Sequence, residues 1–287
     1  MTYATVAILI WSGSLAMLRL GVSASLNAYD LTALRFGTAA LILAPVVIRQ
    51  GFALKQLGSA GLLTMIVGFG APYVMLISIA LETASASAAG SLNPGSMAIV
   101  SLVLGVVVFR DRIGPLGIAG AMLVLVGICM FAGLAEAVTI GHLTLIGSGI
   151  MWAAYSLAVR RSGVSALHAT AIVAVGSAIF YMPVYITILP KLIPDAPWHD
   201  TLAQAGFQGV LVSVIAVFAF NRSAELLGPI TGATLPALIP LVTLVIGALM
   251  LHERAGVAEY FSAALVGLGV AAILASRALA RVSRKSA

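Results

Sequence analysis

Charged residues and cysteines are scarce in this 287-residue chain. Only 8% of the residues are charged, 61% are hydrophobic, and Cys129 is the single cysteine. Soluble domains carry about 25% charged residues because their surface faces water. A single cysteine also excludes a disulfide within the chain and a thiolate metal site. The composition therefore predicts a protein whose surface faces lipid.

Long polar segments are missing as well. Ten apolar runs are each long enough to cross about 30 Å of hydrocarbon as a helix, which takes about 20 residues. They are 4–20, 31–48, 58–80, 84–109, 115–133, 143–159, 167–190, 203–220, 228–251 and 257–276. We therefore predict an all-α integral membrane protein with ten transmembrane helices. The short connections between the runs leave no room for a soluble catalytic domain.

Glycines and prolines recur at one fixed spacing along the chain. The pairs separated by 142 residues are Gly90 and Gly232, Pro94 and Pro236, Gly105 and Gly247, and Gly127 and Gly269. Several matches in one register indicate an internal repeat. We predict a first five-helix repeat over 1–137 and a second over 138–287, which ends in a short basic tail. Because five is odd, the second copy is inverted, an arrangement typical of transporters that alternate access to a midplane cavity.

Basic residues are distributed unequally between the two membrane sides. With a cytoplasmic N-terminus, eleven of the fifteen fall on the cytoplasmic side. They are Arg49, Lys55, Arg110, Arg112, Arg160, Arg161, Arg222, Arg277, Arg281, Arg284 and Lys285. Cytoplasmic loops of membrane proteins are enriched in Lys and Arg. We therefore predict a multi-pass protein of the cell (inner) membrane with both termini in the cytoplasm.

Acidic residues are absent from the middle of every predicted helix. All nine lie in loops or near helix ends. Proton antiport of hydrophobic cations needs a carboxylate that binds the drug or the proton, so this mechanism is disfavoured. An enzyme is not expected either, since no acidic pair, His-Glu cluster or Gly-rich phosphate loop is present. The basic residues are scattered singly, which argues against nucleic-acid binding, and neither a metal nor a cofactor is expected.

Three short motifs carry a resemblance to a known family. They are Ile10-Trp11-Ser12, Trp152-Ala153-Ala154-Tyr155, and the segment from Pro240 to the acidic turn at Glu253. In this order they resemble the EamA-like branch of the drug/metabolite transporter superfamily, and they are particularly similar to amino-acid exporters of the YddG type. The resemblance implies the ten-helix, two-repeat plan and export of small metabolites, chiefly amino acids, through a central cavity.

Polar and aromatic residues away from helix ends are the candidates for this cavity. The substrate-binding candidates are Trp11, Ser12, Tyr73, Ser87, Asn93, Met97, Trp152, Tyr155, Phe218 and Thr234. Ordinary helix packing is the alternative for each aromatic residue, and close helix approach is the commoner use of small residues. Arg35, one turn into the second predicted helix, favours snorkelling or pairing with a neighbour over binding a substrate carboxylate.

Prolines within the fourth and ninth predicted helices are the candidates for hinges. A proline inside a membrane helix removes one backbone hydrogen bond and opens the preceding turn. Pro94, Pro236 and Pro240 could therefore form the bends that gate the cavity. Packing alone is the alternative for each of them.

The sequence thus predicts export of amino acids and related metabolites by alternating access, through a uniporter or a weakly coupled carrier. Drug efflux by proton antiport is one alternative, and a membrane scaffold or sensor that binds without transporting is another. The expected partners are a small-molecule substrate and the lipid bilayer. One chain supplies both repeats, so a monomer can suffice.

Overall fold

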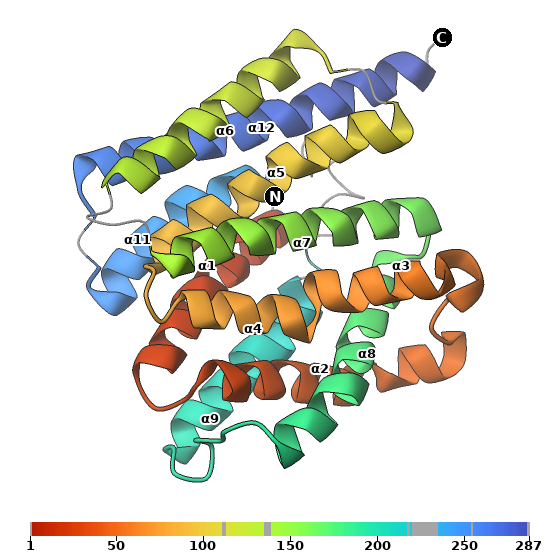
Figure 1. Cartoon of the computed structure of the whole chain (residues 1–287), viewed down its shortest axis with the longest axis vertical. Coiled ribbons are helices and arrows are strands. Elements are labelled where there is room, and N and C mark those ends of the chain that lie inside the picture. Colours follow the sequence, from red (N-terminus) through yellow and green to blue (C-terminus); the bar gives the residue numbers. More distant parts are fainter. Residues whose placement is uncertain are drawn as a thin grey trace.

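A computed structural model describes residues 2–110, 113–134, 139–216, 219, 235–253 and 255–285 of the chain. Nearly all of these residues lie in helices (Figure 1). The first half contains α1 (Thr2–Ser23), α2 (Ala28–Gln50), α3 (Leu54–Phe69), α4 (Ala71–Ala80), α5 (Ala86–Phe109) and α6 (Pro115–Leu134). The second half contains α7 (Ile140–Ser162), α8 (Ala166–Thr187), α9 (Trp198–Gln204), the π-helix η1 (Ala205–Ala216), the 3-10 helix η2 (Leu235–Leu238), α11 (Ile239–Leu251) and α12 (Val257–Lys285).

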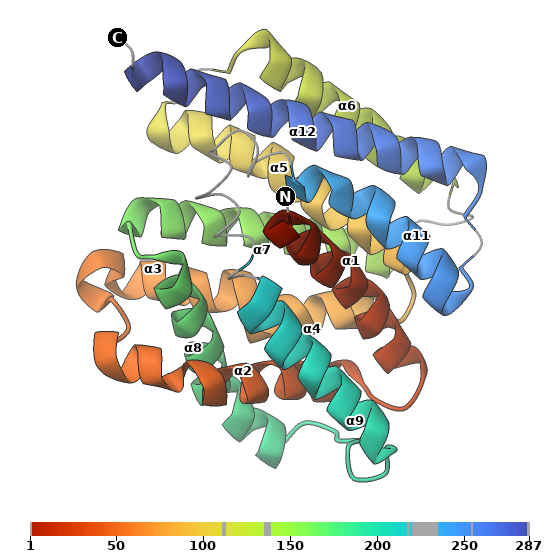
Figure 2. The same ribbon diagram turned by 180° about the vertical axis from the view of Figure 1, so that it is seen from behind.

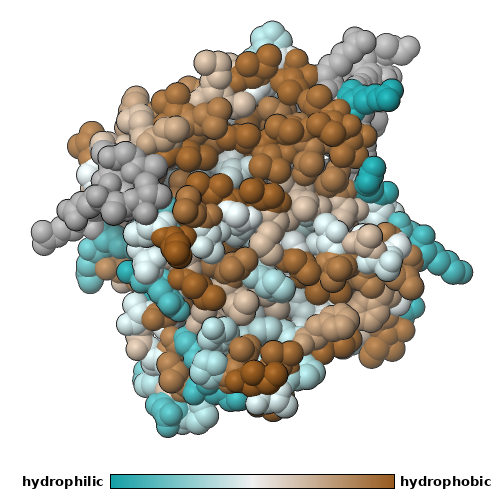
Figure 3. Space-filling model, in the orientation of Figure 1, coloured by the Kyte–Doolittle hydropathy of each residue, from teal (hydrophilic) through white to brown (hydrophobic). Residues whose placement is uncertain are grey.

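Seven helical segments of the described residues are long and apolar enough to span a membrane. Two shorter apolar helices, Pro115–Phe131 and Ile239–Leu251, accompany them. Large hydrophobic side chains stay exposed along these helices, among them Leu41, Val107 and Leu249. Figure 3 shows hydrophobic residues covering the surface over α6 and α12, with hydrophilic residues gathered toward the edges of the view. The all-helical membrane architecture is confirmed, while the count of ten membrane helices stays a prediction.

The same helix contacts recur when each helix is replaced by its counterpart in the other half of the chain. α5 packs on α7 as α1 packs on α11, α3 packs on α7 as α1 packs on η1, and α3 packs on α8 as α2 packs on η1. Three further pairs, α2 with α8, α5 with α11 and α6 with α12, join corresponding helices of the two halves. In Figure 2, α1 lies between α11 and the continuous α9–η1 helix. This pattern fits a two-repeat architecture, and the boundaries at 1–137 and 138–287 stay a prediction.

Glycines allow α6 and α12 to approach closely. A Cβ placed on Gly120 would lie 2.7 Å from the carbonyl oxygen of Gly269, and one on Gly269 would lie 2.6 Å from the carbonyl oxygen of Gly120. Two turns further along α6, a Cβ on Gly127 would lie 2.7 Å from the Val266 side chain. Small residues at membrane helix interfaces let backbones meet and so increase dispersion contacts. Gly127 and Gly269, which match in the sequence repeat, therefore serve the same contact.

One predicted helix is bent in the structure. The run 58–80 is divided at Gly70, where the backbone leaves helical geometry between α3 and α4, with Pro72 in the first turn of α4. The Ala71 amide donates to the hydroxyl of Ser177 from α8 at 3.0 Å, which replaces a helical hydrogen bond lost at the break. A Cβ at Gly70 would collide with the Ile66 carbonyl and the same hydroxyl, so only glycine fits. The bend places Phe69 and Tyr73 on one wall of a cavity.

Candidate functional site

A cavity of about 70 Å³ lies where helices of the two halves meet. Its walls come from α1, α2, α3, α4 and α5 of the first half and from α7, η1 and α11 of the second. The lining residues are Trp11, Ser14, Leu15, Leu18, Arg35, Phe69, Tyr73, Val74, Ile77, Asn93, Pro94, Trp152, Val212 and Ile239. A smaller cavity of about 20 Å³ shares Trp11, Arg35, Phe69 and Val212 with it. The two cavities therefore adjoin at these four residues.

Aromatic rings make up one side of this cavity. Phe69 stacks on Tyr73 with ring centroids 5.0 Å apart and on Tyr155 with centroids 4.6 Å apart. The Trp152 indole lies 5.6 Å from Phe69 and meets Tyr73 edge-on at 6.4 Å. Such offset and edge-on pairs each stabilise a cluster by about 0.5–1.5 kcal/mol beyond surface burial. The rings therefore form a rigid apolar wall on which a flat or hydrophobic substrate group can stack.

Asn93 connects three helices beside this wall. Its side-chain oxygen accepts a hydrogen bond from the Tyr73 hydroxyl of α4 at 3.2 Å, and its amide nitrogen donates to the Ser148 hydroxyl of α7 at 2.7 Å. Ser148 in turn donates to the Leu145 carbonyl at 2.7 Å. All three side chains are buried. Asn93 thus fixes the relative positions of α4, α5 and α7, and Pro94 follows it on the same wall.

The only charged side chain among the described lining residues is Arg35. It lies two turns into α2 and is 8% exposed, so it does not snorkel to the membrane surface. One guanidinium NH donates to the Gln208 side-chain oxygen at 3.2 Å, which also accepts the Ser14 hydroxyl at 2.9 Å. The Gln208 amide nitrogen donates to the Ser14 carbonyl at 3.0 Å. Of the two sequence-based expectations for Arg35, snorkelling is therefore wrong, and the hydrogen bond to Gln208 fits pairing with a neighbour.

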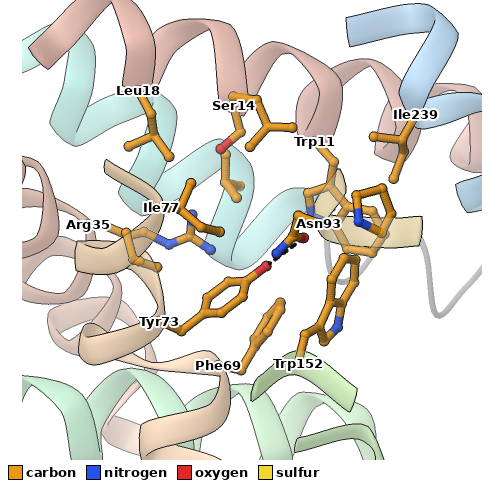
Figure 4. A pocket seen from close by; sticks show the side chains of 14 residues that line it. Trp11, Ser14, Leu18, Arg35, Phe69, Tyr73, Ile77, Asn93, Trp152 and Ile239 are labelled. Atoms are coloured by element: carbon orange, nitrogen blue, oxygen red, sulfur yellow. Dashed lines mark hydrogen bonds between the residues drawn. The ribbon is translucent and has the colours of Figure 1, made fainter. Parts of the chain in front are cut away.

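Figure 4 shows how the charged and aromatic groups divide the cavity. The Arg35 guanidinium enters from one side, Trp11 and Trp152 lie at the opposite side, and the Tyr73–Asn93 hydrogen bond lies between them. The cavity therefore has a cationic end and an aromatic end. This polarity is suited to a molecule with an anionic group at one end and an apolar group at the other.

The sequence-based candidates divide into two groups. Trp11, Tyr73, Asn93 and Trp152 line the cavity, as does the hinge candidate Pro94. Four others do not line it: Ser12, Ser87, Met97 and Tyr155. Phe218 and Thr234 lie outside the described residues. For all of them, contact with a substrate stays a prediction.

Local geometry explains why the second group lies elsewhere. Ser12 is buried about 100° around α1 from Trp11, and its hydroxyl has no hydrogen-bond partner among the described residues. Ser87 contacts the Ser85 hydroxyl at 2.9 Å in the first turn of α5. The Met97 sulfur accepts a hydrogen bond from Ser101 at 3.5 Å. Tyr155 reaches the cavity only through the Phe69 ring on which it stacks.

The three hinge candidates also differ in their surroundings. Pro94 lies inside α5, which continues from Ala86 to Phe109. Pro236 lies in the 3-10 helix η2, and Pro240 lies in the first turn of α11, where its missing N–H costs no hydrogen bond. In this structure the two prolines of the ninth predicted helix mark the change from 3-10 to α geometry. Their role in gating stays a prediction.

Several lining residues were not among the candidates. Phe69 could have been found from Gly70-Ala71-Pro72, because a glycine and a proline in one apolar run signal a break. Gln208 does not line the cavity but holds Arg35, and it is one of two amides, with Gln204, in an apolar segment, which is a signal of the same kind. Leu15, Val74 and Ile239 carry no such signal, because apolar residues face lipid, core and cavity alike.

Comparisons with known proteins agree with this architecture. The model of the EamA-like transporter family matches residues 1–133 and again 139–275. A solved structure titled "Crystal structure of protein" matches with a TM-score of 0.66 and 21% identity, over 96% of each chain, which shows a shared fold. A search among curated proteins found no match. Since the family model covers nearly the whole chain in two successive halves, the protein belongs to the EamA-like transporter family, whose members are membrane transporters of small molecules.

Proposed function

We propose that this protein exports amino acids and related small metabolites from the cytoplasm by alternating access, without obligatory proton coupling. The observation that carries the proposal is the cavity between the two halves, with an aromatic end at Trp11 and Trp152 and a polar centre at Tyr73 and Asn93. A site between two related halves can be exposed to either side when one half tilts against the other.

The size of the cavity supports a change of conformation during transport. A volume of about 70 Å³ is well below the roughly 300–1,000 Å³ of typical small-molecule pockets. A hydrophobic amino acid needs more space, so its entry requires the walls to move apart. Pro94 of α5 and Ile239 of α11 both line the cavity, so a bend in either helix would enlarge it.

The ionisable groups support uncoupled transport. Among the described lining residues there is no carboxylate and no histidine, and the one charged side chain is Arg35. A carrier that binds its substrate without a titrating side chain can let the substrate move down its own concentration gradient. An amino acid accumulated in the cytoplasm would then leave along its own gradient.

Counterflow in proteoliposomes tests the proposal. Vesicles loaded with unlabelled amino acid are placed in labelled Leu, Phe, Met or Thr, with and without a pH gradient. We expect saturable uptake that does not depend on the gradient and that falls about tenfold or more in Trp152→Ala, which removes the aromatic end. Trp198→Ala is the matched control, because Trp198 is 75% exposed at the start of α9.

Three outcomes would contradict the proposal. Uptake only with a pH gradient would refute uncoupled transport and favour proton antiport. Binding of amino acids without any flux would favour a sensor. If none of the amino acids is exchanged, amino acids are not the substrates.

A further inference from the structure

The buried charge of Arg35 is only partly satisfied by the protein. A guanidinium has five N–H donors, and among the described residues it forms one hydrogen bond, to Gln208. The Nε atom is fully buried and has no partner among the described residues. The Gln208 oxygen also accepts from Ser14. A buried cation with unused donors is costly unless an anion or water completes its shell.

No acidic side chain of the described residues compensates this charge. Asp30 is the nearest in the sequence, but five residues along a helix place it about 140° away from Arg35. Its carboxylate accepts hydrogen bonds from the Tyr185 hydroxyl at 2.6 Å and from the Leu192 amide at 3.0 Å, at the opposite face of α2. Asp200 accepts from Ser25, and Glu253 accepts from the Ala86 amide. Arg35 itself lines both cavities, so a bound anion can approach its guanidinium from there.

From this arrangement we propose that Arg35 is the binding site for the carboxylate of the transported molecule, and that the substrates are small organic acids with an apolar tail. The inference rests on the proposed transport function and specifies its substrate class. Arginine presents a planar fork of donors that matches a carboxylate with two parallel hydrogen bonds. Gln208, itself bonded to Ser14, holds the guanidinium in place, and the substrate supplies the missing anion.

The same arrangement orients the substrate. With the carboxylate at Arg35, the apolar tail extends past Tyr73 toward Trp11 and Trp152, as the side chains are placed in Figure 4. No acidic side chain of the described residues lines the cavity to receive an ammonium group. The carboxylate is therefore required for binding, whereas the amino group is not. An acid that lacks the amino group should bind, and an amide that lacks the carboxylate should not.

Ligand-induced thermal stabilisation of the purified protein tests this without relying on flux. The probes are leucine, 4-methylpentanoate and leucinamide, which share one tail but differ in the carboxylate and the amino group. We expect leucine and 4-methylpentanoate to raise the unfolding temperature of the wild type and leucinamide to leave it unchanged. The same order is expected for inhibition of leucine counterflow.

The decisive variant is Gln208→Glu. It places a carboxylate of nearly the same shape next to Arg35, so the internal anion should keep the fold stable and exclude the substrate anion. We expect an unfolding temperature near that of the wild type, because the ion pair with Arg35 offsets the lost hydrogen bond to the Ser14 carbonyl, together with no shift with 4-methylpentanoate and at least tenfold weaker leucine counterflow. Arg35→Gln should also lose the shift, whereas Arg19→Gln should keep it, because Arg19 donates to the Leu81 carbonyl outside the cavity.

The outcomes separate this inference from the proposed function. Leucinamide that stabilises and competes as well as leucine, or a Gln208→Glu protein that keeps the acid-induced shift, would overturn the role of Arg35 and leave amino-acid transport intact. Stabilisation by carboxylates without any exchange would support Arg35 as the anion site and refute transport. No stabilisation by any probe would overturn the inference.

Discussion

The hydrogen bond between Tyr73 and Asn93 gives a quantitative test of how the cavity wall is held. Hydrogen bonds between membrane helices average about 0.6 kcal/mol and reach about 1.7 kcal/mol. Tyr73→Phe removes one such bond, of 3.2 Å, and keeps the ring stacked on Phe69. Asn93→Ala removes that bond and the 2.7 Å bond to Ser148. We expect losses in the free energy of unfolding of about 1 kcal/mol for the first variant and about 1–3 kcal/mol for the second.

A double-mutant cycle isolates the pair. The Tyr73–Asn93 bond is already lost in either single variant. The double variant should therefore be more stable than the sum of the two single losses predicts, by about 0.6–1.7 kcal/mol. The assay is reversible unfolding in mixed micelles, followed by helix content. Tyr155→Phe combined with Asn93→Ala is the matched control, because Tyr155 stacks on the same Phe69 but does not contact Asn93 through a hydrogen bond. Coupling no larger than the roughly 0.3–0.5 kcal/mol scatter of independent sites would refute the bridging role.

Three further predictions concern helix packing, substrate stacking and topology. Gly269→Ala places a methyl group 2.6 Å from the Gly120 carbonyl oxygen, so it should lower the free energy of unfolding by about 1–3 kcal/mol. Gly147→Ala is the control, because Gly147 has open space around it and the variant should keep the stability of the wild type. Thermal unfolding distinguishes the two variants. Phe69→Ala loses stacking of about 0.5–1.5 kcal/mol and should raise the half-saturation concentration for phenylalanine about twofold to tenfold in counterflow. Phe180→Ala, at a side chain that is 69% exposed, should leave this concentration unchanged. Epitope tags at both termini should be digested by protease only in inside-out vesicles; digestion of either tag from outside intact cells would overturn the predicted topology.

The sequence predicts those features that follow from length, composition and the repeat. Long apolar runs become helices because lipid cannot satisfy unpaired backbone groups, and the recurring Gly127 and Gly269 indicate the repeat. Trp11 and Trp152 could be found because the family motifs contain both. These signals are properties of the chain itself, so they do not depend on how the helices are arranged.

The rest of the site depends on tertiary packing. Ser12 and Tyr155 belong to the motifs that contain Trp11 and Trp152, but the rotation of each helix turns them away from the cavity. Arg35 lies near the predicted start of its helix, where snorkelling is the usual outcome. Instead of reaching the membrane surface, the guanidinium donates a hydrogen bond to Gln208, which is 173 residues away in the sequence. No local pattern in a single sequence encodes such a contact.

The two helices with the hinge candidates are joined at one end. The Glu253 carboxylate, just after α11, accepts a hydrogen bond from the Ala86 amide in the first turn of α5 at 3.0 Å, where a helix N-terminus favours an anion. Nearby, a Cβ on Gly90 would lie 2.7 Å from that of Thr243, so the backbones of α5 and α11 are already close. Both helices line the cavity through Asn93 and Ile239. Under the proposed alternating access, a route from the cavity between these ends would have to break the Glu253 contact, so one step of opening would lie at the junction of the two halves.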